Sequence, residues 1–138
     1  MVRTITTDKD FKKFVKYCEY WKEYLDLDDV NATYEHVTLV EHEDKLAVSF
    51  YCYTNSGARI VLNTDWDEPV TDEKLEQTAY EEMAHILTGP VATLMSWREY
   101  NEDSAEAEVH RLIHKFRHTI DKYRNKIDKL EKKLRKNK

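Results

Sequence analysis

The chain has 138 residues, of which 41% are hydrophobic and 12% aromatic, so we expect one domain with a substantial apolar core. No stretch approaches the roughly 18 consecutive apolar residues of a transmembrane helix. Residues 1–7 also lack the apolar core of a signal peptide. We therefore expect a protein that makes no membrane contact and resides in the cytoplasm.

Charge is unevenly distributed along the chain, although the formal net charge is only −5. Residues 121–138 contain nine Lys and Arg and three Asp and Glu, a net charge of +6, which leaves −11 for residues 1–120. This asymmetry predicts a domain over residues 1–120 and a basic helical extension over residues 121–138. The acidic domain opposes a long nucleic-acid contact, and no base-reading motif accompanies the basic tail, so direct nucleic-acid binding is not expected.

An amphipathic helix is predicted over residues 8–25. Thr7 is a good N-cap, and Asp10 three residues later completes a box-like arrangement. Apolar residues then recur at helical spacing, namely Phe11, Phe14, Val15, Cys18, Trp21, Tyr24 and Leu25. Cys18 and Cys52 are the only cysteines. We expect both to be buried and free, as in a reducing cytoplasm.

Three strands are predicted to follow. The first covers about residues 32–40. The second shows strict alternation, with Leu46, Val48, Phe50 and Cys52 on one face and Ala47, Ser49, Tyr51 and Tyr53 on the other. Alternate residues of the third are apolar, namely Ala58, Ile60 and Leu62. Residues 55–57, Asn-Ser-Gly, form a turn between the second and third strands, which predicts an antiparallel hairpin.

A second helix is predicted from the N-cap Thr71 to the stop signal Gly89-Pro90, followed by a shorter helix over residues 91–100. The second helix contains Glu-Glu-Met-Ala-His at residues 81–85. This sequence resembles the zinc-peptidase signature His-Glu-x-x-His, with glutamate in place of the first histidine.

The helical geometry of this motif suits a metal site. Glu81 and His85 lie one turn apart on one face, as the two zinc ligands of the signature do. Glu82 occupies the position of the general base that activates the metal-bound water. Helical spacing predicts an inward stripe of Leu75, Thr78, Ala79, Glu82, His85 and Ile86.

The last helix is predicted to start at Asp103 or Ser104. Its apolar positions alternate steps of four and three residues, a heptad seam typical of coiled coils, formed by Val109, Ile113, Phe116, Ile120, Tyr123, Ile127, Leu130 and Leu134. We expect the part before about Arg117 to pack on the domain and the rest to extend beyond it.

The same seam points to a candidate third ligand. Extending it backward by three residues from Val109 reaches Glu106, which is predicted to face inward, whereas Glu108 is turned away. His110 and His114 follow at steps of four, and a histidine pair at that spacing is competent to bind a metal. An exposed acid at a helix start explains Glu106 equally well. A solvated helix face is the commoner explanation of the histidines.

In this order, the elements resemble small phage-encoded metallopeptidases of the SprT-like or minimal gluzincin type. The likeness covers roughly residues 8–120 and rests on six ordered pieces: the aromatic N-terminal helix, the hairpin ending at residues 60–64, Trp66-Asp67 leading to residues 70–75, the motif, the apolar residues 85–91, and residues 106–112.

This resemblance implies an α+β, zincin-like fold with an N-terminal helix, a small three-stranded, mainly antiparallel sheet, the motif helix and a long C-terminal helix. It implies zinc held by His85 and Glu106, with Glu82 as the general base. Glu81 stands where the family has histidine. A carboxylate can bind zinc, but a more anionic site weakens the metal's effect on the pKa of its water. We therefore expect a catalytically impaired metallopeptidase homologue acting on a peptide or host protein in a bacterial cytoplasm.

Three alternatives remain at this point. The motif residues can be ordinary polar residues of a helix surface. The chain can be a non-enzymatic, anti-CRISPR-like inhibitor of a host defence or nucleic-acid-handling protein, whose acidic surface occupies a basic channel. It can also be a coiled-coil module that forms a homodimer through the C-terminal heptad helix, because an apolar seam needs a partner to bury it.

Overall fold

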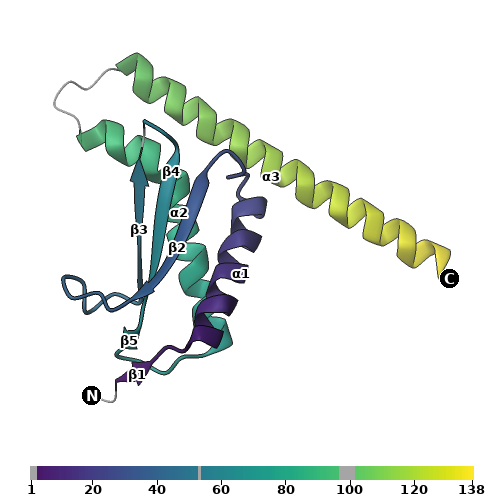
Figure 1. Cartoon of the computed structure of the whole chain (residues 1–138). Coiled ribbons are helices and arrows are strands. Elements are labelled where there is room, and N and C mark those ends of the chain that lie inside the picture. The colour runs from purple at the N-terminus through teal and green to yellow at the C-terminus, as the bar shows by residue number, and fades with distance from the viewer. Residues whose placement is uncertain (1–2, 53, 97–101) are drawn as a thin grey trace.

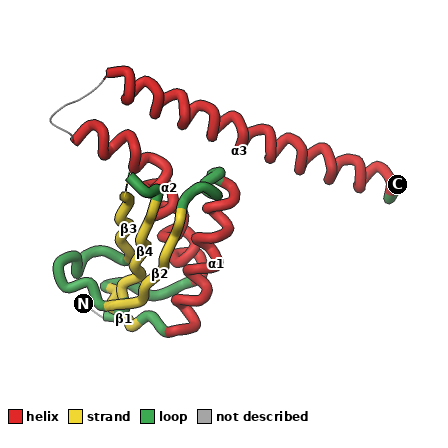
Figure 2. Tube along the Cα trace, turned by 45° about the horizontal axis from the view of Figure 1, so that its top comes forward, coloured by secondary structure: helices red, strands yellow, loops and turns green. Residues whose placement is uncertain are grey.

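The computed structural model describes residues 3–52, 54–96 and 102–138, and its elements form an α+β arrangement (Figure 1). In chain order these elements are β1 (Thr4–Ile5), α1 (Asp8–Tyr24), β2 (Asn31–Val37), β3 (Ala47–Cys52), β4 (Gly57–Asn63), β5 (Asp65–Trp66), α2 (Asp72–Ser96) and α3 (Glu102–Lys136). Figure 2 shows α1 and α2 on one face of the sheet that β2, β3 and β4 form. The expected α+β class with a long C-terminal helix is confirmed.

The N-terminus of α1 follows the local sequence signals closely. The Asp10 backbone N–H donates to the Thr7 hydroxyl at 3.2 Å, and the Thr7 backbone N–H donates to the Asp10 carboxylate at 2.8 Å. This reciprocal capping box satisfies two backbone donors that would otherwise lack an intrahelical partner. Phe14 and Cys18 form the fully buried part of the helix.

The three-stranded sheet has the order β2-β4-β3. The predicted antiparallel hairpin of β3 and β4 is confirmed, with Ser49 paired to Ile60. β2, however, runs parallel to β4, so the expectation of a mainly antiparallel sheet is wrong for one of the two strand pairs. β4 takes the centre because residues 60–62, Ile-Val-Leu, are buried on both faces, as is typical of a central strand.

The core lies between the sheet and the two helices. Its fully buried side chains come from all three elements and from β5, namely Phe14, Cys18, Ile60, Leu62, Trp66, Leu75, Ala79 and Met83. Trp66 belongs to a short antiparallel pair of β1 and β5 that the alternation of residues does not predict, since each strand has only two residues. This strand pair holds residues near the N-terminus beside the segment that leads into α2.

The helix α2 does not stop at Gly89-Pro90, as the sequence predicts, but continues to Ser96. The reason is packing. A Cβ on Gly89 would lie 2.9 Å from the Tyr51 ring of β3, so the glycine allows a close approach of helix and strand. Pro90 is buried within the same helix and removes only one backbone donor. A separate helix over residues 91–96 is therefore wrong, and residues 97–100 lie outside the described part.

The second face of the sheet is only partly open to solvent, because Val61 of the central strand is buried there. Phe50 and Val37 are a little under half exposed there, and the Arg59 guanidinium lies over the Phe50 ring at 4.8 Å from its centroid. Cys52 belongs to this open face and is exposed. The expectation of two buried thiols is therefore wrong for Cys52 and right for Cys18, while both are free.

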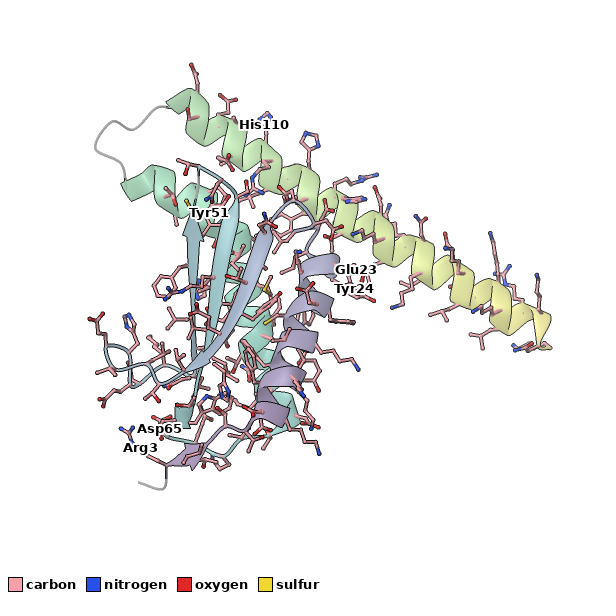
Figure 3. The ribbon with its side chains drawn as sticks, in the orientation of Figure 1. Arg3, Glu23, Tyr24, Tyr51, Asp65 and His110 are labelled. Atoms are coloured by element: carbon pink, nitrogen blue, oxygen red, sulfur yellow. The ribbon has the colours of Figure 1, made fainter. Side chains whose placement is uncertain are left out.

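The helix α3 crosses the C-terminal end of α1 and then extends beyond the rest of the molecule (Figure 1). Four of its side chains donate to backbone carbonyls of the body: Arg111 to Leu87, Lys115 to Asp26, Thr119 to Tyr24 and Lys122 to Glu23. The last three carbonyls lie at or just after the end of α1, where carbonyls lack intrahelical partners and cations are favoured. Figure 3 shows Glu23 and Tyr24 at this junction.

Most contacts with the body use the polar side of α3 rather than the heptad seam, although the seam residue Tyr123 packs on Tyr24 with 5.3 Å between the ring centroids. The first part of α3 packs on the body as expected, but Val109, Ile113 and Phe116 are each about half exposed, so the expectation is wrong for the seam itself. Leu112, which lies beside the seam, makes the apolar contact with the core instead. The carbonyls at the end of α1 accept from these Lys and Thr side chains, which therefore lie on the side of α3 that faces the body.

Candidate functional site

A cleft of about 280 Å³ lies between α2 and β3, which is an edge strand of the sheet. Its lining consists of Lys45, Ala47, Val48, Ser49, Glu82 and His85. The structure therefore brings two of the predicted site residues, Glu82 and His85, into one concave site. It adds Ser49 and Lys45, which the motif analysis does not single out.

Glu82 is the buried carboxyl of this cleft, with 8% of its surface exposed. Burial raises the pKa of Glu82 above its ordinary value of 4.5, because the charged form loses solvation. A hydrogen bond with Ser49 and the nearby His85 lower the pKa, and the Glu81 carboxylate raises it, but burial prevails. A buried acid with a raised pKa in a cleft is the kind of group found at functional sites.

His85 and Glu81 do not face the core. His85 is exposed, so the prediction that it lies on the inward stripe is wrong. The buried side chains of α2 include Met83 and Leu87. The buried face of the helix is therefore centred away from His85. Glu81 is exposed on the same side, where the Gln77 amide donates to it at 3.4 Å.

Glu106 is not placed with His85 and Glu81. It is exposed and lies 3.9 Å from His110 on the same exposed side of α3, and Figure 3 shows His110 projecting away from the body. Glu108, predicted to be turned away, is the acid that faces the body, where it accepts from Arg111 at 2.6 Å. His114 is exposed as well.

A catalytic zinc site needs three protein ligands that converge on one point. Among the residues that the structure describes, no three His, Cys, Asp or Glu side chains gather in this way. The proposed ligands Glu81, His85 and Glu106, and the additional pair His110 and His114, therefore do not fit a zinc centre in this arrangement. No catalytic step through a metal follows from it.

Sequence reasoning missed Ser49 and Lys45 because neither belongs to a motif. A signal for Ser49 was nevertheless present. It shares the inward face of its strand with Ala47 and Tyr51, and a small polar residue on a core-facing position needs a polar partner. Glu82 is that partner.

Comparisons of the chain with protein-family models, with curated proteins and with solved structures find no match. In the described ranges, no helix is long and apolar enough to cross a membrane. The likeness to zincins therefore rests on the ordered sequence motifs alone and stays a hypothesis.

The raised pKa of Glu82 predicts a specific pH dependence of stability. Because the folded-state pKa exceeds the unfolded one, the folded protein binds more protons between the two values, and stability falls as pH rises through this window. Glu82→Gln cannot ionise, so its thermal midpoint is expected to decline less than that of the wild type between pH 4 and pH 8. Thermal unfolding followed by circular dichroism measures this difference.

The matched control for this prediction is Glu131→Gln, which makes the same chemical change at an exposed residue of α3. We expect it to leave the pH profile of stability close to that of the wild type. Identical profiles for Glu82→Gln and the wild type would mean that Glu82 ionises as freely in the folded protein as in the unfolded chain.

Proposed function

We propose that the chain is a zincin-type peptidase homologue that has lost peptidase activity and binds an extended segment of a partner protein in the cleft between β3 and α2. One observation carries this proposal. Glu82 and His85, the two motif residues that the chain retains, line the cleft beside the edge strand β3, whereas Glu81 and Glu106 do not.

The edge strand supports the choice of ligand. β3 pairs with β4 on one side only among the described strands, so the other side of its backbone offers N–H and C=O groups without a strand partner. An extended peptide can add to such an edge through main-chain hydrogen bonds, while the cleft selects alternate side chains. Lys45 and Glu82 give the cleft one group of each charge.

The arrangement of the candidate ligands supports the proposed loss of hydrolysis. Amide hydrolysis in this class needs a group that both activates water and stabilises the developing oxyanion. Glu82 can accept a proton, but the described residues around it do not gather the further ligands that such a group requires. Binding without turnover is the activity that the cleft supports.

Selection from a phage-displayed library of random-sequence peptides tests the proposal. We expect the full-length protein to enrich peptides that it binds without cleaving. Ser49→Arg, which fills the cleft, is expected to weaken their binding at least about tenfold, as the loss of a buried contact region does. The matched control Val37→Arg adds the same side chain to the open face of β2 and is expected to leave binding unchanged.

Two results would contradict this function. Equal binding of the selected peptides by the wild type and Ser49→Arg would place the ligand elsewhere on the molecule. Zinc-dependent cleavage of casein by the wild type that disappears in Glu82→Gln would mean that the chain is an active metallopeptidase.

A second candidate, inhibition of a host defence or nucleic-acid-handling protein, is favoured by the net charge of −11 over residues 1–120. Three exposed acids, Glu41, Glu43 and Asp44, lie together in the loop before β3. An acidic surface speeds association with a basic partner and makes it sensitive to salt. Selected peptides that are rich in Lys and Arg, lose affinity steeply with salt and ignore Ser49→Arg would favour this second function.

A further inference from the structure

The heptad seam of α3 is exposed along its whole length. Its eight side chains each keep between 42% and 65% of their surface accessible, and they are Val109, Ile113, Phe116, Ile120, Tyr123, Ile127, Leu130 and Leu134. The body contacts α3 chiefly through the neighbouring positions Arg111, Lys115 and Thr119. Tyr123 is a seam residue that also touches the body, where it packs on Tyr24, and it remains 42% exposed. The seam therefore stays available while α3 is docked.

The size of this surface matches a stable interface. From Val109 to Leu134 the seam extends about 38 Å at 1.5 Å per residue. If each of its side chains retains on the order of 100 Å² of exposed area, the seam offers roughly 800 Å² per chain, the usual size of a specific protein interface. An exposed apolar surface of this extent marks an interaction site.

The charges at the two ends of α3 indicate what covers the seam. Residues 102–108 contain four acidic and no basic residues, and residues 132–138 contain five basic and no acidic residues. Two parallel copies would place like charges together at both ends. Two antiparallel copies place the acidic end of each helix beside the basic end of the other, which is favourable for the charges and for the helix dipoles.

The sizes of the seam residues agree with the same orientation. In an antiparallel pair centred between Asp121 and Lys122, Phe116 lies opposite Ile127, and Tyr123 lies opposite Ile120. Every layer then pairs one residue with a different one, and each aromatic ring meets a branched aliphatic side chain. A parallel pair in register would oppose each of these rings to its own copy.

We propose that α3 pairs with α3 of a second copy of this chain, forming an antiparallel two-stranded coiled coil over residues 109–134. The pairing uses one surface twice, as a two-fold dimer requires. It leaves the two bodies at opposite ends of the coiled coil, so that the free C-terminal half of each α3 covers the seam of the partner's docked half.

Sedimentation equilibrium of the full-length protein tests the association. The wild type is expected to be a dimer. Leu130→Asp buries a charge in two layers of the interface and is expected to raise the dimer dissociation constant at least about hundredfold. Leu130 lies beyond the residues that contact the body, so the variant keeps the fold of the domain, which circular dichroism checks. Asn125→Asp adds the same side chain on the exposed opposite side and is expected to remain dimeric.

Disulfide trapping tests the orientation in a Cys52→Ser background, which removes the exposed native thiol. Val109→Cys and Leu134→Cys are expected to form a cross-linked dimer when the two variants are mixed and oxidised. Neither variant is expected to cross-link alone, because residue 109 of one chain lies opposite residue 134 of the other. Cross-linking of each variant alone would overturn the antiparallel orientation.

The same experiments give different results if the seam is covered by something other than a second copy of α3. A wild type that stays monomeric at the highest concentration reached would overturn the proposal. Monomers whose seam binds vesicles of anionic lipid, with loss of binding in Leu130→Asp, would assign the surface to a membrane instead. A dimer that persists unchanged in Leu130→Asp would place the interface elsewhere on the molecule.

Discussion

Trp66→Ala is expected to lower the free energy of unfolding by about 3–5 kcal/mol, the usual loss for a large-to-small change of a buried aromatic residue. Trp66 is fully buried, and its indole N–H donates to the Leu46 carbonyl at 3.1 Å. The alanine variant would therefore leave a cavity in the core and remove one of the two hydrogen bonds of the Leu46 carbonyl, which still accepts from the Asn63 backbone N–H at 2.9 Å. Urea denaturation followed by circular dichroism measures the change.

Two variants separate the contributions of Trp66. Trp66→Phe keeps most of the apolar volume but loses the hydrogen bond, so its destabilisation is expected to lie between those of the wild type and Trp66→Ala. Val40→Ala changes an apolar residue that is 76% exposed and is expected to cost less than about 0.5 kcal/mol. A loss below 1 kcal/mol for Trp66→Ala, well under the range for core aromatics, would contradict the central place of this side chain in the core.

Lys115→Glu is expected to have the second-largest effect, a loss of about 2–4 kcal/mol in the free energy of unfolding. Only 11% of the Lys115 side chain is exposed, and its ammonium group donates to the Asp26 carbonyl and to the Asp29 carboxylate. A glutamate there would face a carbonyl and a carboxylate with no donor between them. We expect α3 to detach from the end of α1.

Hydrogen exchange locates this second effect. Backbone amides in residues 108–122 should exchange faster in Lys115→Glu, while those of β4 keep their protection, because only the α3 contact is lost. Lys129→Glu makes the same charge reversal at an exposed position of α3 and is expected to change neither stability nor exchange at residues 108–122. Unchanged exchange in Lys115→Glu would mean that α3 is held by Leu112 and its neighbours alone.

The way in which α3 docks on the body also determines where the predicted zinc ligand Glu106 lies. The sequence places Glu106 inward on the assumption that the heptad seam packs on the domain. The structure turns the seam outward, because Lys115, Thr119 and Lys122 bind the carbonyls at the end of α1. Glu106 is therefore exposed to solvent, as the seam is. Glu108 faces the body instead, where it pairs with Arg111. Among the described residues, neither Glu106 nor Glu108 gathers with Glu82 and His85 into a set of metal ligands.

Part of the candidate site was predictable from the sequence and part was not. Glu82 is a buried polar position because it shares a helical stripe with Leu75, Thr78 and Ala79, a relation that depends only on spacing. His85 lies at the edge of that stripe, where spacing alone cannot decide between core and solvent. Ser49 enters the site only because the edge strand β3 packs beside α2, which no local pattern specifies.

The local elements of this protein can be predicted from residues that are close together in the chain. The capping box at Thr7, the β3–β4 hairpin and the heptad seam of α3 follow from turns, caps and periodicities within a few residues. The folded structure was needed to establish that β2 pairs in parallel with β4, that α2 continues through Gly89 and Pro90, and that α3 presents its seam to solvent. Each of these depends on contacts between residues far apart in the chain, such as Gly89 with Tyr51 and Lys115 with Asp26, and local propensity carries no information about such contacts.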